Sequence, residues 1–132
     1  MYATYPWTVG ASLLAILVLI WLMGRVGTAR GKYKISAPAT AGDPAFERVY
    51  RAHLNSVEQF VLFLPALWLF AAAWGDAAAG ILGLLWSLAR VHYAIAYGRA
   101  AEKRGLGMMA GFMVLLALVL GAAAKWLMLW LG

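Results

Sequence analysis

The stretch FERVYRAHLNSVE, residues 46–58, runs directly into an apolar segment that reaches Trp74. Within it, Arg51, Asn55 and Glu58 are four and three residues apart, so an arginine, an amide and a carboxylate share one face of a helix. Polar and ionisable groups at the mouth of a hydrophobic helix are costly there and usually serve a function. We therefore predict a membrane-spanning helix that carries a binding site for a polar, charged molecule at the membrane surface.

The composition of the whole chain indicates a membrane protein. Hydrophobic residues make up 65% of the 132 residues and charged residues 12%, whereas a soluble domain has roughly half and a quarter. The chain has no cysteine, which excludes thiolate metal sites and a cysteine nucleophile. The net charge is +6, and the basic residues lie beside apolar segments. This distribution favours anionic lipid head groups or an anionic small molecule as partners, and no nucleic acid.

Four segments are long enough to cross a bilayer, since a helical span needs about 20 apolar residues. They cover residues 7–25, 45–74, 76–103 and 106–131, within a single domain over residues 1–132. Asp43 is a candidate N-cap for the second span, and Pro44 suits its first turn. We predict an all-α integral membrane protein with four transmembrane helices in an up-down bundle.

The basic residues predict how the bundle is oriented. The turn Trp74-Gly75-Asp76 and the stretch before the first span contain none. By the positive-inside rule, loops one and three are cytoplasmic and both termini face the other side. The basic residues of these two loops are Arg25, Arg30, Lys32 and Lys34 in the first, and Arg99, Lys103 and Arg104 in the third.

The tight turn at residues 74–76 makes the second and third spans antiparallel neighbours, so depth can be counted from it. At 1.5 Å per residue, the polar positions of the second span lie about 24 to 34 Å from the turn, and those of the third about 21 to 31 Å. The face of the third span, extended by seven residues, reaches Arg104. The two sets are therefore expected in one layer, with Arg51, Asn55 and Glu58 opposite Arg90, Tyr93 and Tyr97.

Each of these residues also has a purely structural interpretation. Arg90 could form an interhelical ion pair with Glu58 that only holds the bundle, and Arg48 and Arg99 could anchor to lipid head groups. The two histidines lack the spacing of metal ligands, so we predict no metal site. Glu58 is the only acid near several arginines of this layer, which favours an anionic ligand or lipid phosphates as the missing counter-charge.

On these motifs the chain resembles the family of membrane-associated proteins in eicosanoid and glutathione metabolism (MAPEG). The resemblance is closest to the branch of microsomal glutathione transferases, the leukotriene-synthesising glutathione transferase and the lipoxygenase-activating protein. It implies a four-helix protomer of a homotrimer, with glutathione held between neighbouring subunits. The residues that carry the resemblance are Phe46 to Ala52, Asn55 and Glu58, then Ala89, Arg90, Tyr93, Tyr97, Gly98 and Arg104.

The resemblance also implies roles for individual residues. Arg104 would be the catalytic residue, because it matches the arginine that stabilises the glutathione thiolate. Gly31 and Leu116 stand where the leukotriene-synthesising member has an arginine and a tryptophan, which argues against a dedicated leukotriene synthase. Gln59 stands where an aromatic residue is common, and Val61 where a proline is usual. The implied glutathione-binding residues are Arg30, Arg51, Asn55, Glu58, Tyr93 and Tyr97, with Arg48, His53, Gln59 and Arg90 in support.

The resemblance and the residues together predict a membrane-bound glutathione transferase. It would use glutathione as co-substrate, activate it as a thiolate and conjugate it to hydrophobic electrophiles from the bilayer, with reduction of lipid hydroperoxides as an additional activity. The alternative is a non-catalytic lipid-binding or scaffold protein similar to the lipoxygenase-activating member. That member departs at the position of Arg51, so the arginine here favours the enzyme. A transporter is disfavoured because the outer half of every span is apolar.

Overall fold

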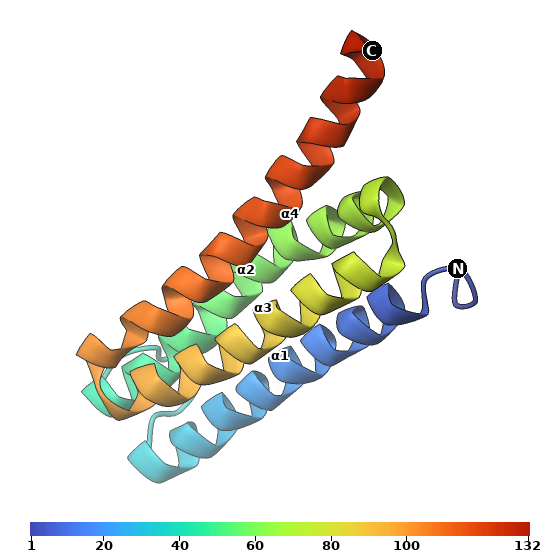
Figure 1. Ribbon diagram of the computed structural model, residues 1–132. Coiled ribbons are helices and arrows are strands. Elements are labelled where there is room, and N and C mark those ends of the chain that lie inside the picture. The colour runs from blue at the N-terminus through green and yellow to red at the C-terminus, as the bar shows by residue number, and fades with distance from the viewer.

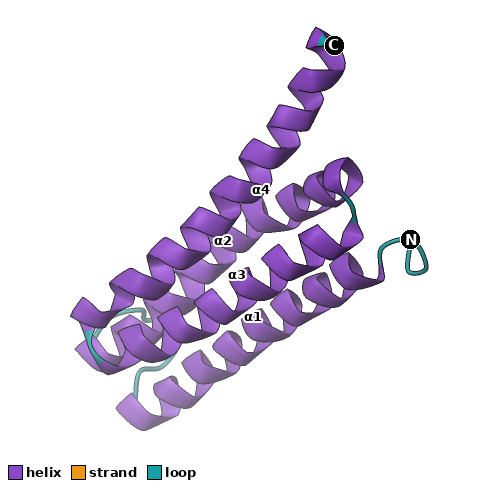
Figure 2. Ribbon diagram, in the orientation of Figure 1, coloured by secondary structure: helices purple, strands orange, loops and turns teal.

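The computed structural model describes all 132 residues and consists of four long helices that lie side by side (Figure 1). There is no strand (Figure 2). Each of the four helices is long and apolar enough to cross a membrane, which confirms the predicted all-α membrane fold. The helices are α1 (Pro6–Tyr33), α2 (Pro44–Trp74), α3 (Asp76–Arg99) and α4 (Gly105–Leu131), and the short 3₁₀ helix η1 (Ala101–Arg104) precedes α4.

The start of α2 is fixed by Asp43, as the sequence predicts. Its carboxylate Oδ1 accepts from the backbone N–H groups of Ala45 at 2.8 Å and Phe46 at 3.3 Å. Two otherwise unpaired donors of the first turn are thereby satisfied. Helix α2 has 31 residues, a length of roughly 46 Å, whereas the hydrocarbon core is about 30 Å thick. Its charged first turns can therefore extend beyond the apolar layer.

Helix α1 is longer than the sequence predicted. It continues to Tyr33 rather than ending near residue 25, and Lys34 closes it in the left-handed conformation with φ of 54°. Arg25, Arg30 and Lys32, for which the sequence predicts a loop, are therefore helical. The prediction was wrong because hydropathy marks where apolar side chains stop, whereas arginine and lysine are good helix formers.

The α2–α3 turn is attached to the beginning of α1. Asp76 accepts from the backbone N–H groups of Thr8 at 2.7 Å and Trp7 at 3.0 Å through its two carboxylate oxygens. These N–H groups belong to the first turn of α1, where the helix dipole also favours a negative charge. At this end of the bundle, where α1 starts and α2 meets α3 (Figure 1), the Asp76 carboxylate therefore links the α2–α3 turn to α1.

Helix α3 approaches α1 through two glycines. A Cβ at Gly83 would lie 2.6 Å from Cβ of Ala11, and one at Gly80 would lie 2.5 Å from Cβ of Trp7. Small residues at helix crossings are the usual means of close packing in membranes. One turn further along α3, Trp86 stacks on Phe63 of α2 with ring centroids 4.1 Å apart. Helix α3 is thus buried between its neighbours, while the C-terminal part of α4 projects beyond them (Figure 1).

The close approach at Gly83 gives a test of the packing. Gly83→Ala should lower the thermal unfolding temperature of the detergent-solubilised protein, because the added methyl group meets Ala11 and overpacking costs about 1–3 kcal/mol. Gly10→Ala is the matched control, because a Cβ there meets nothing within 4 Å and should leave the temperature unchanged or raise it. Ala11→Gly should restore the stability of Gly83→Ala; failure of this rescue would mean that the contact is not the cause.

Candidate functional site

A hydrogen bond between α2 and α3 lies at the centre of the predicted polar layer. The amide Nδ2 of Asn55 donates to the hydroxyl oxygen of Tyr93 at 2.7 Å. The ring of Tyr93 is fully buried, while Asn55 is half-buried at the edge of the bundle. This bond confirms that Asn55 of α2 and Tyr93 of α3 lie at the same depth, as the residue count predicts.

Arg90, Tyr93 and Tyr97 form a continuous column along one face of α3, and Arg104 of η1 extends it. The guanidinium of Arg90 lies 4.2 Å from the ring centroid of Tyr93, and Tyr93 stacks on Tyr97 with centroids 5.6 Å apart. The guanidinium of Arg104 lies over the other tyrosine, 5.6 Å from the centroid of Tyr97. Cations over aromatic faces are attractive, more so when they are shielded from water.

Arg104 reaches this column from outside α3. The backbone leaves the helix at Ala100, with φ of −156° and ψ of 135°, and η1 then leads to Arg104 at the start of α4. The seven-residue extension of the α3 face therefore predicts the right neighbour, although the chain between Tyr97 and Arg104 is not one continuous helix. Arg104 itself is exposed, so its guanidinium is accessible at the end of the column.

The expected ion pair between Arg90 and Glu58 does not form. Arg90 is fully buried and donates from Nε and Nη2 to the hydroxyl oxygen of Ser56, at 3.0 and 2.9 Å. Ser56 in turn donates to the carbonyl of Ala52 at 2.8 Å. Glu58 is exposed, because a residue two positions from Ser56 points to nearly the opposite side of the helix. The pairing prediction was therefore wrong.

Helix α4 closes over Arg90 through glycines. A Cβ at Gly107 would lie 2.6 Å from the backbone nitrogen of Tyr93. At Gly111 it would lie 3.2 Å from Oε1 of Gln59 and 3.6 Å from Nη1 of Arg90, which has no acceptor. Gln59 Oε1 accepts from the indole N–H of Trp86 at 3.2 Å. Gln59, which stands where an aromatic residue is common, thus has a structural role: it accepts from Trp86 and lies beside the buried arginine.

Ser56 and the two α4 glycines are site residues that the sequence analysis missed. Ser56 follows Asn55 directly, so the same depth count already brings it close to the level of Arg90. Gly107 and Gly111 are four residues apart, the small-residue spacing typical of close membrane-helix packing.

The remaining predicted residues do not join the column. Arg51 and Glu58 are exposed on the outward face of α2, about 10 Å apart along its axis. Arg30 donates from Nη1 to the carbonyls of Ile35 at 3.3 Å and Ala39 at 2.7 Å, and lies over the ring of Phe46. Arg30 therefore stabilises the loop between α1 and α2 of its own chain. The supporting candidates Arg48 and His53 are half-buried on α2.

The arrangement therefore has a rigid half and an open half. The rigid half is a tyrosine column with an accessible arginine at its end. The open half presents a cation, an amide and an anion in a row along α2, namely Arg51, Asn55 and Glu58. Such a row complements an extended zwitterion, with its carboxylate at Arg51 and its ammonium group at Glu58.

Comparison with known proteins identifies relatives of the whole bundle. The sequence profile of the MAPEG family matches residues 8–124. An uncharacterised protein of Synechocystis sp. is 44% identical over 116 residues, which cover 88% of this chain and 85% of that protein. Microsomal glutathione S-transferase 2 of Mus musculus is 40% identical over 120 residues, 88% of this chain and 82% of the relative. Leukotriene C4 synthase of Bos taurus is 39% identical over 93 residues, 70% of this chain and 62% of the synthase.

The hydrogen bond between Arg90 and Ser56 can be tested with two serines. Ser56→Ala should destabilise the protein by about 2–3 kcal/mol, because a buried guanidinium loses its acceptor. Ser12→Ala is the matched control: both hydroxyls donate to a carbonyl four residues earlier at 2.8 Å, and Ser56 alone also accepts from Arg90. Equal losses in denaturant unfolding of the two variants would contradict a special role for Ser56.

Proposed function

This chain belongs to the MAPEG family, and we propose that it is a membrane-bound glutathione transferase. The observation that carries the proposal is the contact between Arg104 and the column of Tyr93 and Tyr97, beside the polar row on α2. Two relatives, 39% and 40% identical to this chain, carry names that describe leukotriene C4 synthesis and glutathione transfer. Their names support glutathione as co-substrate here.

The open half of the site suits glutathione. This tripeptide carries two carboxylates, one ammonium group and two peptide amides. Arg51 would hold a carboxylate through its planar fork, Glu58 would hold the ammonium group, and Asn55 would meet the peptide backbone. The spacing of about 10 Å between the charged ends is that of an extended tripeptide.

The rigid half would activate the thiol. A free thiol has a pKa of about 8.5, and the thiolate is the nucleophile. A cation beside the sulfur favours the thiolate, and lowering the thiol pKa by two units requires only about 3 kcal/mol. Arg104 is the cation, while Tyr93 accepts its hydrogen bond from Asn55 and so retains its own proton for donation to the sulfur.

The chemistry then needs no protein nucleophile. The thiolate attacks an electrophilic carbon, a sulfur–carbon bond forms, and the leaving group departs with its electron pair or an opened epoxide oxygen takes a proton from solvent. Reduction of a lipid hydroperoxide would be the additional activity, in which two glutathiones are oxidised to their disulfide while the hydroperoxide becomes an alcohol and water.

A groove between α2 and α4 would supply the hydrophobic substrate. It has a volume of about 890 Å³ and is lined mostly by hydrophobic side chains, including Leu62, Phe112 and Leu116. Phe112 directly follows Gly111, the α4 residue that packs against Arg90, so the groove begins near the level of the buried arginine. Leu116 lines it where the leukotriene-synthesising member has a tryptophan, which supports a broad range of apolar electrophiles rather than one lipid.

The outward position of Arg51 and Glu58 supports a homotrimer. A neighbouring subunit packed on this face of α2 would enclose glutathione and remove both charges from direct contact with lipid. We also propose that the end of the bundle with η1 and the start of α2 is cytoplasmic, because it carries most of the basic residues. Glutathione from the aqueous side would then enter at the site directly.

The measurement that tests the proposal is whether the protein binds glutathione as the thiolate. Glutathione added to the purified, detergent-solubilised protein should give a saturable ultraviolet difference absorbance of the thiolate at neutral pH. Arg104→Ala should abolish this signal and reduce conjugation of a model electrophile about 25-fold at pH 7, the fall in thiolate fraction when the thiol pKa rises by two units to about 8.5. Glutathione binding should remain measurable. Lys103→Ala is the control, since it removes a charge from the same turn η1 without touching the column.

Two results would contradict the proposal. A thiolate signal that persists in Arg104→Ala would remove that residue from the catalytic role. An absence of binding at millimolar glutathione would favour the non-catalytic lipid-binding alternative, in which the groove between α2 and α4 is the functional site.

A further inference from the structure

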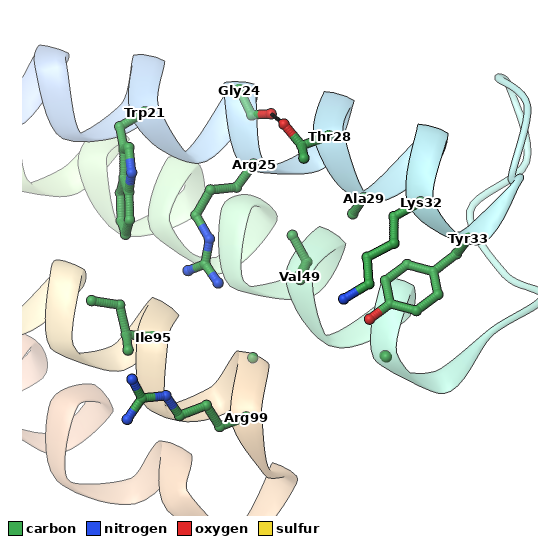
Figure 3. A pocket seen from close by; sticks show the side chains of 12 residues that line it. Trp21, Gly24, Arg25, Thr28, Ala29, Lys32, Tyr33, Val49, Ile95 and Arg99 are labelled. Atoms are coloured by element: carbon green, nitrogen blue, oxygen red, sulfur yellow. Dashed lines mark hydrogen bonds between the residues drawn. The ribbon is translucent and has the colours of Figure 1, made fainter.

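A second pocket lies on a different side of the bundle, where α1 and α3 end and α2 begins (Figure 3). Its volume is about 670 Å³. We propose that this pocket binds the phosphate head group of an anionic phospholipid, through Arg25 and Lys32 of α1 and Arg99 of α3. None of the residues of the glutathione site lines it.

The pocket is built by a regular stripe on α1. Trp21, Arg25, Thr28 and Lys32 follow one another at spacings of four, three and four, so they share one helix face. In Figure 3 the side chains of Arg25 and Lys32 extend from α1 into the space between the helices, and that of Arg99 lies along α3 below them. On α3, Arg99 is two positions from Tyr97 and therefore points away from the tyrosine column.

The lining has three cations and no acid. The acids of the chain are used elsewhere: Asp43 caps α2, Glu47 accepts from the backbone of Gly42, and Asp76 binds the start of α1. The other two, Glu58 and Glu102, are exposed and do not line the pocket. Three like charges around one cavity repel one another, so an anion in the cavity would be strongly favoured.

The guanidinium of Arg25 is held in place without a counter-charge. It lies 5.0 Å from the ring centroid of Trp21. Its Nη2 lies 3.0 Å from where a Cβ would stand at Gly98, so a glycine at that position leaves room for it. Arginine in a fixed orientation is the preferred side chain for a phosphate, because its planar fork binds two oxygens at once.

The order of the lining residues points to a lipid rather than to a soluble phosphate. Trp21 lies about 6 Å deeper along α1 than Arg25, and Lys32 lies about 10 Å further out. Ile95 of α3 lies one turn deeper than Arg99. The pocket therefore changes from apolar to cationic along the helix axes, as a phospholipid does from acyl chain to phosphate. Three cations also favour a lipid with net negative charge over a zwitterionic one.

Lipid binding can be measured by native mass spectrometry of the delipidated protein in detergent, titrated with phosphatidylglycerol. One molecule per chain should bind saturably. Arg25→Gln should weaken this binding about tenfold or more, whereas Lys34→Gln, which removes the same charge beside the pocket, should change it less than twofold. Arg99→Gln is the second variant. Arg99 is exposed, so its replacement leaves the packed interior intact and tests the pocket even where Arg25→Gln lowers stability.

Three outcomes would overturn the proposal. Phosphatidylcholine that binds as tightly as phosphatidylglycerol would exclude recognition of the net charge. Glycerol 3-phosphate that competes at equal concentration would identify a soluble phosphate as the ligand instead of a lipid. If Lys34→Gln weakened phosphatidylglycerol binding as much as the two pocket variants, the binding would depend on the overall positive charge of this end of the bundle and not on the pocket.

Discussion

The buried guanidinium of Arg90 is the constraint on which the rest of the structure depends. A cation with no exposed surface and no carboxylate partner is costly, so the three helices around it must pack closely and offer neutral partners, although Nη1 keeps no acceptor. Ser56 of α2 accepts two of its hydrogen bonds, Tyr93 of α3 offers a ring face, and Gly111 lets α4 close over it. These contacts fix the register of the three helices. They also fix Tyr93, and through Tyr93 the position of Asn55.

The same constraint separates the two halves of the site. Side chains that face Arg90 are buried and held by several contacts, so their geometry does not depend on a ligand. Arg51 and Glu58 lie on the outward face of the same helix and are free to adjust. A thiol needs an exact position relative to a cation, whereas the charged ends of a flexible tripeptide need only be within reach. The buried tyrosines of the column are fixed in this way, whereas Arg104, the proposed cation, is exposed and is oriented by its contact with the ring of Tyr97.

The sequence predicts depth well and direction around a helix poorly. Counting residues from the tight turn correctly brought Asn55 opposite Tyr93, and the capping pattern correctly placed Asp43. The partner of Arg90 was predicted wrongly because Ser56 and Glu58 differ by only about 3 Å in height but point in nearly opposite directions. The C-terminal end of α1 could not be predicted from hydropathy either, because its last turns are helical but contain basic residues. The pocket around Arg25 follows from that extension.

The use of the few acids explains why so many arginines remain for ligands. Asp43, Glu47 and Asp76 all bind backbone N–H groups at helix ends, where a carboxylate is strongly favoured and where it organises the fold. None of them is left to neutralise Arg25, Arg99 or Arg104. This end of the bundle therefore presents cations on two faces: Arg104 of η1 lies beside the tyrosine column, and Arg25 of α1 and Arg99 of α3 line the pocket beside Trp21. An anionic co-substrate on the first face and an anionic lipid on the second would complete the charge balance that the chain itself lacks.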